Sequence, residues 1–165
     1  MELFIAIFQG IIIASTPLVL AAVGELVVEK SGVLNLGVEG MMIIGAVTSF
    51  IVTYETGSHF LGLIAAVISA GLVASLFGLL TQYLLSNQVA TGLALTLFGL
   101  GLASLIGQTY SGISLDAFPV FDVYLLTEIP IIGSLLFNFD YLIYLSIIIV
   151  VSVYYFLNKT KLGLV

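Results

Sequence analysis

The chain has 165 residues, of which 61% are hydrophobic and only 7% are charged, and its mean hydropathy is +1.32. Soluble domains carry about 25% charged residues, so this composition excludes a soluble globular protein and indicates an integral membrane protein. Only three lysines stand against nine acidic residues, which excludes a basic surface for nucleic acid. The absence of cysteine excludes disulfides, thiolate metal sites and cysteine nucleophiles.

Five stretches are long and apolar enough, or nearly so, to cross the hydrocarbon core as helices of about 20 residues. They run approximately over Leu3–Val28, Leu36–Tyr54, Phe60–Leu85, Val89–Gln108 and Tyr141–Leu157. The sequence therefore predicts an all-α fold, a polytopic membrane helix bundle that forms a single transmembrane domain over residues 1–165. One of the five spans is expected to be a broken helix.

Glu2 stands directly before the first predicted span, where a secretory signal would carry a basic residue, so this span is expected to be retained. Pro17 in its middle removes a backbone hydrogen bond and predicts a kink. Beside it, Gln9 and Thr16 are candidates for lining a polar path. The alternative is that the hydroxyls bond back to carbonyls of the preceding turn.

The second predicted span carries the polar stretch KSGVLNLGVEGMM, which runs from Lys30 to Met42. Met41–Tyr54 alone gives about 14 residues, or roughly 21 Å of helix, which is too short to cross. The span must therefore recruit Leu36–Gly40, and the three glycines of the stretch predict a turn or a discontinuous helix.

Asn35 and Glu39 are four residues apart, so they would share a face wherever the stretch is helical. That face should meet protein, water or solute, because a carboxylate facing lipid costs about 2.5 kcal/mol or more. Two interpretations stay open: the two side chains cap unpaired amides of a broken helix, or they line a translocation path.

The third and fourth predicted spans carry further signals. Small residues recur at every fourth position of the third span, a spacing that lets another helix approach closely in lipid; they are Gly62, Ala66, Ala70, Ala74 and Gly78. Near the start of the fourth span, Gln88, Thr91 and Thr96 are weaker candidates for the polar path. No catalytic motif and no metal-binding spacing occurs in the chain, so no catalytic residue, resident cofactor or metal site is predicted.

The lysines predict the orientation of the chain in the membrane. Lys30 follows the first span, and Lys159 and Lys161 follow the fifth, so with five spans all three fall on one side. The positive-inside rule makes that side cytoplasmic. The N-terminus is then expected outside, and Gln108–Asp140 is expected to be extracytoplasmic.

The stretch Thr16–Phe50 closely resembles the N-terminal signature of ABC-importer permease subunits of the branched-chain amino acid and simple-sugar superfamily. Within that superfamily it is most similar to the branch assigned to nucleosides, and GVLNLGVEGMM at Gly32–Met42 is the specific part. The resemblance continues over three further segments, SNQVATGLALTL, EIPIIGSLLF and NKTKLGL, at Ser86–Leu97, Glu128–Phe137 and Asn158–Leu164. Permeases of this kind are about twice as long, so the resemblance implies the N-terminal half of one.

This resemblance implies the function and the partners of the protein. It implies uptake of a nucleoside or a related small polar solute across a bacterial cytoplasmic membrane, with a simple sugar as the alternative solute. The implied partners are a cytoplasmic ATPase that binds the ATP, a second identical or different permease subunit, and an extracytoplasmic solute-binding protein. Lys159, Lys161 and Gly163 would approach the ATPase contact, whereas Asn35 and Glu39 match the family's polar signature.

Two hypotheses from other classes compete with the importer. A proton-coupled secondary carrier or channel would use Glu39 as its titrating group and would need no ATPase. A non-transporting membrane subunit would only pack against its partners through the small residues of the third span.

Overall fold

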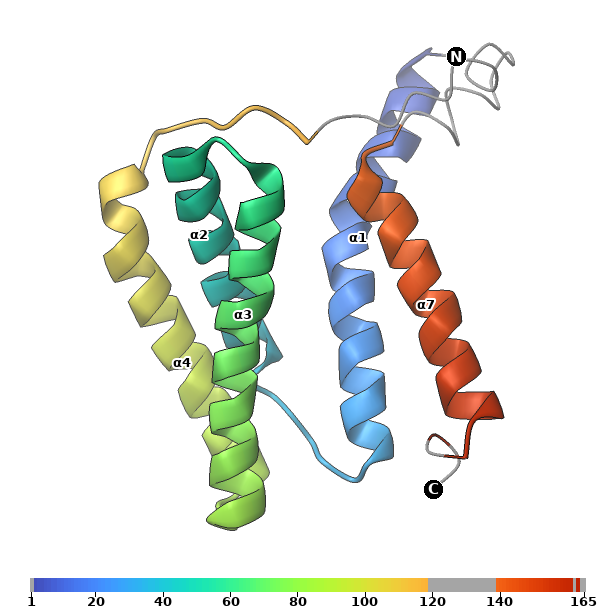
Figure 1. The fold of residues 1–165 in the computed structure, drawn as a ribbon, viewed down its shortest axis with the longest axis vertical. Helices are drawn as coiled ribbons and strands as arrows, with labels where there is room; N and C mark the ends of the chain where they lie inside the picture. The colour runs from blue at the N-terminus through green and yellow to red at the C-terminus, as the bar shows by residue number, and fades with distance from the viewer. Residues whose placement is uncertain (1, 119–138, 162, 164–165) are drawn as a thin grey trace. The chain divides into compact units, whose positions relative to one another are not determined.

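A computed structural model of the protein describes residues 2–118, 139–161 and 163. Within these residues, five helices are long and apolar enough to cross a membrane (Figure 1). They are α1 (Glu2–Lys30), α2 (Val38–Thr56), α3 (His59–Gly78), α4 (Gln88–Gly107) and α7 (Tyr141–Lys159). A π-helical turn, η1 (Leu79–Tyr83), extends α3, and a 3₁₀ turn, η2 (Gln108–Tyr110), extends α4. The predicted all-α fold with five spans is confirmed. Most of the predicted extracytoplasmic segment, including Glu128–Phe137, lies outside the described residues.

The chain divides into two compact units. One unit comprises Met1–Val27 and Ala117–Val165, and the other comprises Val28–Asp116. The first unit contains most of α1 and all of α7. Helix α1 runs without interruption through Pro17, so the proline is accommodated inside a continuous helix. The second unit contains α2, α3 and α4, together with the polar stretch between α1 and α2.

The second unit is organised around α2, which packs against both α3 and α4. Its core consists of five buried apolar side chains contributed by all three helices: Met41, Ile44, Val73, Phe77 and Leu95. A hydroxyl pair adds a polar link, since Thr48 Oγ1 of α2 lies 2.6 Å from Ser69 Oγ of α3. The start of α2 is therefore held between two neighbouring helices.

Helix α2 begins and ends later than the sequence predicted. It covers 19 residues from Val38 to Thr56, or about 28 Å at the helical rise. Compared with the apolar stretch Met41–Tyr54, the helix gains three residues at its start and two at its end, whereas Leu36 and Gly37 of the predicted span lie outside it. Of the two structures predicted for the polar stretch, a turn or a discontinuous helix, the structure shows the turn: the irregular backbone at 31–37 separates α1 from α2, and α2 itself is continuous.

The small residues of α3 face α2 only over the first part of the helix. Gly62 of α3 is buried, and a Cβ added to it would overlap Thr53 of α2. From the other side, a Cβ added to Gly45 of α2 would lie 3.4 Å from the carbonyl oxygen of Ala66 and 3.6 Å from the Cβ of Ala70, both in α3. Ala74 is exposed, and a Cβ on Gly78 would meet nothing within 4 Å. Residues four apart advance about 400° around a helix, so the row of small residues rotates away from α2.

Gly32 ends α1 in a left-handed conformation. Its φ is +81°, its N–H donates to the carbonyl of Glu29 at 2.9 Å, and Val33 N–H donates to the carbonyl of Val28 at 3.3 Å. These two bonds form a Schellman motif, in which a left-handed residue satisfies the last carbonyls of a helix. The motif explains why a glycine follows Lys30 and Ser31.

We expect Gly32→Ala to lower the free energy of unfolding by roughly 1–2 kcal/mol, because an L side chain is strained at positive φ. Thermal unfolding of the purified transporter in detergent measures this as a lower Tm. The matched control is Gly24→Ala in α1, where a Cβ meets nothing within 4 Å. Equal Tm values for the two variants would contradict the strain at Gly32.

Candidate functional site

The site lies where the irregular segment before α2 meets the first half of α4. Asn35 is buried there, with 7% of its surface exposed. Its Oδ1 accepts a hydrogen bond from the N–H of Gly37 at 2.9 Å, and its Nδ2 donates to Met41 Sδ at 3.6 Å. Gly37 is the N-cap residue of α2 and has no capping side chain of its own. Asn35 therefore satisfies a backbone donor at the start of the helix.

Glu39 lies in the first turn of α2 and is exposed. Asn35 and Glu39 do not share a helical face, because the stretch is not helical at Asn35, which precedes the helix and is buried. A carboxylate near a helix N-terminus is stabilised by the helix dipole by about 0.3–1 kcal/mol. In the part of the chain that the structure describes, no hydrogen bond engages the Glu39 side chain, so its charge is available to water, a partner or solute.

Side chains on one face of α4 bind backbone groups of the irregular segment before α2. Gln88 Oε1 accepts a hydrogen bond from Leu34 N–H at 2.8 Å, and Thr96 Oγ1 donates to the carbonyl oxygen of Leu36 at 3.0 Å. Gly92 lies between these two positions and is buried. Sequence analysis gave Gln88 and Thr96 little weight. The signal that could have identified them is their spacing with Gly92, one residue every four along a single helix face.

Glycines allow the two backbones to touch. A Cβ on Gly92 would lie 2.9 Å from the nitrogens of both Leu36 and Gly37, and a Cβ on Gly99 would lie 2.6 Å from Gly40 Cα. Such distances are far below ordinary carbon contacts of about 3.5–4.0 Å. The approach of α2 to α4 therefore requires glycine on both sides, a use of small residues typical of membrane helices.

The polar residues of α1 belong to the compact unit that does not contain this site. Thr16 Oγ1 and Ser15 Oγ both donate to the carbonyl of Ile12, at 2.8 and 3.1 Å. This is the backbone-bonded alternative that the sequence left open. Gln9 is half-buried in the same helix. Both Gln9 and Thr16 belong to the other compact unit, so a role for them in a solute path stays a prediction.

Thr91 lies on the α3 side of α4. Its Oγ1 is 2.8 Å from Ser86 Oγ, which in turn donates to the carbonyl of Leu80. Thr91 is one of the residues that line an open groove of about 490 Å³ between α4 and the end of α3; the others are Leu76, Leu80, Ala90, Ala94, Leu95 and Phe98. The groove is mainly apolar, so it suits an apolar occupant better than a sugar or nucleoside.

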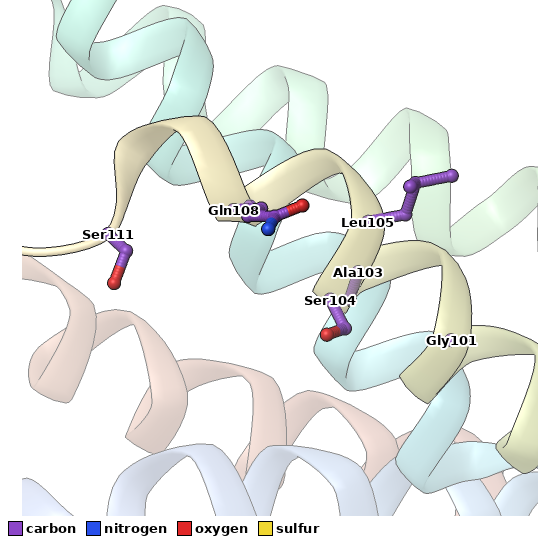
Figure 2. A pocket seen from close by; sticks show the side chains of 7 residues that line it. Gly101, Ala103, Ser104, Leu105, Gln108 and Ser111 are labelled. Atoms are coloured by element: carbon purple, nitrogen blue, oxygen red, sulfur yellow. The ribbon is translucent and has the colours of Figure 1, made fainter.

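A second hollow borders the C-terminal half of α4 and the turn after it (Figure 2). Gly101, Ser104, Leu105 and Gln108 share one face of the helix by their spacing, and Ser111 follows in the turn. Figure 2 shows the hydroxyls of Ser104 and Ser111 projecting from the ribbon. Two hydroxyls and an amide can bind a polar solute. Sequence analysis did not single out this face, although its polar residues recur at helical spacing.

The residues predicted to approach an ATPase lie at the end of α7. Lys159 is the last residue of the helix, and both Lys159 and Lys161 are exposed. Gly163 N–H donates to the carbonyl and to the hydroxyl of Thr160, each at 3.2 Å. A Cβ on Gly163 would overlap the carbonyl of Phe156, so glycine is required for this turn. The contact with an ATPase stays a prediction.

The fold and composition define the class as an α-helical integral membrane protein. Residues 7–165 match the family described as the permease component of branched-chain amino acid transport systems. The chain belongs to this family.

Three curated relatives cover nearly all of the chain. It is 39% identical to "Putative glucose ABC transporter permease protein TsgC13" of Haloferax volcanii, over 92% of this chain and 47% of the relative. It is 29% identical to the nucleoside ABC transporter permease protein NupC of Lactococcus lactis, over 96% of this chain and 53% of the relative. It is 28% identical to the guanosine ABC transporter permease protein NupQ of Bacillus subtilis, with the same two coverages. The chain thus spans about half the length of these relatives. No solved structure gives a significant match.

Proposed function

We propose that the chain forms part of the permease subunit of an ATP-driven ABC importer, and that it lines part of the path of a nucleoside or a related small polar solute. The observation that carries this proposal is the family match over residues 7–165. Two of the relatives carry nucleoside or guanosine in their names. The exposed carboxylate of Glu39 in the first turn of α2 adds support, because an ionisable residue in a membrane-spanning segment is typical of a solute or ion path.

The proposal includes the partners that this chemistry requires. No phosphate-binding loop occurs in the sequence, so a separate cytoplasmic ATPase would bind and hydrolyse the ATP. A second permease subunit and an extracytoplasmic solute-binding protein would complete the transporter. The N-terminus would lie outside, and the lysine-bearing ends of α1 and α7 would lie in the cytoplasm, where Lys159 and Lys161 approach the ATPase.

Within the site, the two signature residues take different roles in the proposal. Asn35 shapes the path indirectly, because its side chain is buried and holds the Gly37 amide. Glu39 is exposed in the first turn of α2 and is the group that would meet water or solute. Thr16, Gln9 and Thr91 would contribute at other levels of the path.

Two alternatives rest on specific observations. A simple sugar is supported by the glucose permease named among the relatives, which has the higher identity of the three. A proton-coupled carrier is supported by the exposed carboxylate of Glu39 near the end of a membrane span.

Uptake of labelled solutes tests these functions. Cells that express the transporter containing this chain are given a panel of purine nucleosides, pyrimidine nucleosides and simple sugars. We expect nucleoside uptake that disappears when the ATPase is inactivated by substitution of its catalytic residue. Uptake of sugars alone would show that the solute is a sugar and not a nucleoside, and the protein would still be part of an ABC importer. Uptake that persists without the ATPase and follows a pH gradient would establish the proton-coupled carrier instead.

A further inference from the structure

Gln88, Gly92 and Thr96 lie on one face of α4, and each contacts backbone atoms of the segment before α2. Gln88 Oε1 binds the N–H of Leu34, and Thr96 Oγ1 binds the carbonyl of Leu36. Between them, a Cβ on Gly92 would lie 2.9 Å from the backbone nitrogen of Leu36 and 3.0 Å from its carbonyl carbon. The segment Leu34–Gly37 is therefore fixed to α4 at three successive helical positions.

These contacts satisfy a backbone that has no regular partner. Residues 33–35 have no helical structure, and α2 starts at Val38. Near a membrane boundary, each unpaired N–H or C=O group costs free energy unless protein or water satisfies it. Gln88 supplies the acceptor for the N–H of Leu34, and Thr96 supplies the donor for the carbonyl of Leu36. Asn35 supplies the acceptor for a third, the Gly37 N–H, at 2.9 Å.

We propose that Gln88 and Thr96 are positioning residues, which clamp the Leu34–Gly37 segment to α4 so that the start of α2, with Glu39, moves together with α4 during transport. This inference rests on the proposed importer function. The clamp uses the side-chain atoms Gln88 Oε1 and Thr96 Oγ1, and these atoms are engaged with backbone groups and do not bind solute. Loss of the clamp should therefore slow the transport cycle and leave the affinity for solute unchanged.

Paired substitutions test the clamp at each residue. Thr96→Val keeps the shape but removes the hydroxyl donor, whereas Thr96→Ser keeps the donor. Gln88→Leu removes the acceptor, whereas Gln88→Glu keeps an oxygen acceptor for Leu34 N–H. In the complete transporter, we expect Thr96→Val and Gln88→Leu to lower the maximal uptake rate per assembled complex by about fivefold, the scale of one lost intramolecular hydrogen bond. The KM for solute should change less than about twofold. The variants Thr96→Ser and Gln88→Glu should keep most of the wild-type rate.

Amide hydrogen exchange gives a second measurement that does not need transport. The Leu34 amide should exchange faster in Gln88→Leu than in wild type, and Gln88→Glu should restore its protection. Thr96→Val serves as the comparison, because it leaves the acceptor of that amide intact. Unchanged Leu34 exchange in Gln88→Leu would overturn the clamp.

The outcomes separate this inference from the importer function. If wild type shows no ATPase-dependent uptake, the proposed function fails, whatever the exchange data show. If wild type transports and Thr96→Val matches it in rate per complex, the positioning role fails while the importer function stands. A lower yield of Thr96→Val complex at an unchanged rate per complex would make Thr96 a merely structural residue and would also overturn the proposal.

Discussion

Replacing Gly40 by alanine is expected to separate α2 from α4 and to lower the free energy of unfolding by about 1–3 kcal/mol or more, the cost of overpacking a close contact. The added Cβ would lie 2.5 Å from the carbonyl oxygen of Leu95 and 2.7 Å from Thr96 Cα. Both atoms belong to the backbone of a helix, so neither can rotate away. The measurement is the Tm and the yield of the assembled transporter in detergent.

The control for this prediction is Gly71→Ala in α3, where a Cβ meets nothing within 4 Å. Alanine is a better helix former than glycine by about 1 kcal/mol, so this variant should keep or raise the Tm. Gly99→Ala should behave like Gly40→Ala, since its Cβ would lie 2.6 Å from Gly40 Cα. A Tm for Gly40→Ala equal to that of the control would show that the two helices do not approach as closely as described.

Asn35→Ala and Glu39→Ala are expected to fail in different ways, although both residues belong to the same polar stretch. Asn35→Ala leaves the Gly37 N–H without its acceptor, which costs about 1–3 kcal/mol for a buried donor. It should therefore reduce the yield of folded complex as well as uptake. Glu39 is exposed, so Glu39→Ala should reduce uptake about tenfold or more, the scale of one lost hydrogen bond to a charged group, while the yield changes little.

Uptake per assembled complex, measured alongside complex yield, distinguishes the two effects. Glu29→Ala is the matched control, because Glu29 is an exposed carboxylate in the last turn of α1, a short distance before Glu39 along the chain. We expect wild-type uptake for this control. Wild-type uptake by Glu39→Ala would remove Glu39 from the solute path and would also refute the proton-coupled alternative.

The five spans could be predicted from the sequence because their cause is local. A helix that crosses lipid must satisfy its own backbone and must be apolar along its length, and both conditions are visible in composition and length. The ends of the spans were harder to place. Helix α2 extends to Thr56 and is capped by Gly57, whose φ is +68°, whereas the span predicted from the sequence ended at Tyr54.

The site could be predicted only in part because its geometry depends on residues that are far apart in the chain. The polar stretch itself was recognisable from Asn35, Glu39 and the glycines. Its structure is decided by Gln88 and Thr96, which are 54 and 60 residues away from their partners in the chain. A helical spacing rule assumes that the stretch is helical, and tertiary contacts with α4 made it irregular. The shared face of Asn35 and Glu39 was lost for that reason.

The hydrogen bonds from α4 also have a consequence for biosynthesis. At roughly 5–20 residues per second, a ribosome needs about 3–12 s to reach the partners of Leu34 and Leu36, which lie 54 and 60 residues further on. Helix α2 is the least hydrophobic of the five spans, so its own sequence favours insertion into the bilayer less than the sequences of the other four do. During those seconds the backbone before α2 must be hydrated or held by the insertion machinery. The two hydrogen bonds that hold the segment before α2 can therefore form only after the first half of α4 has been made.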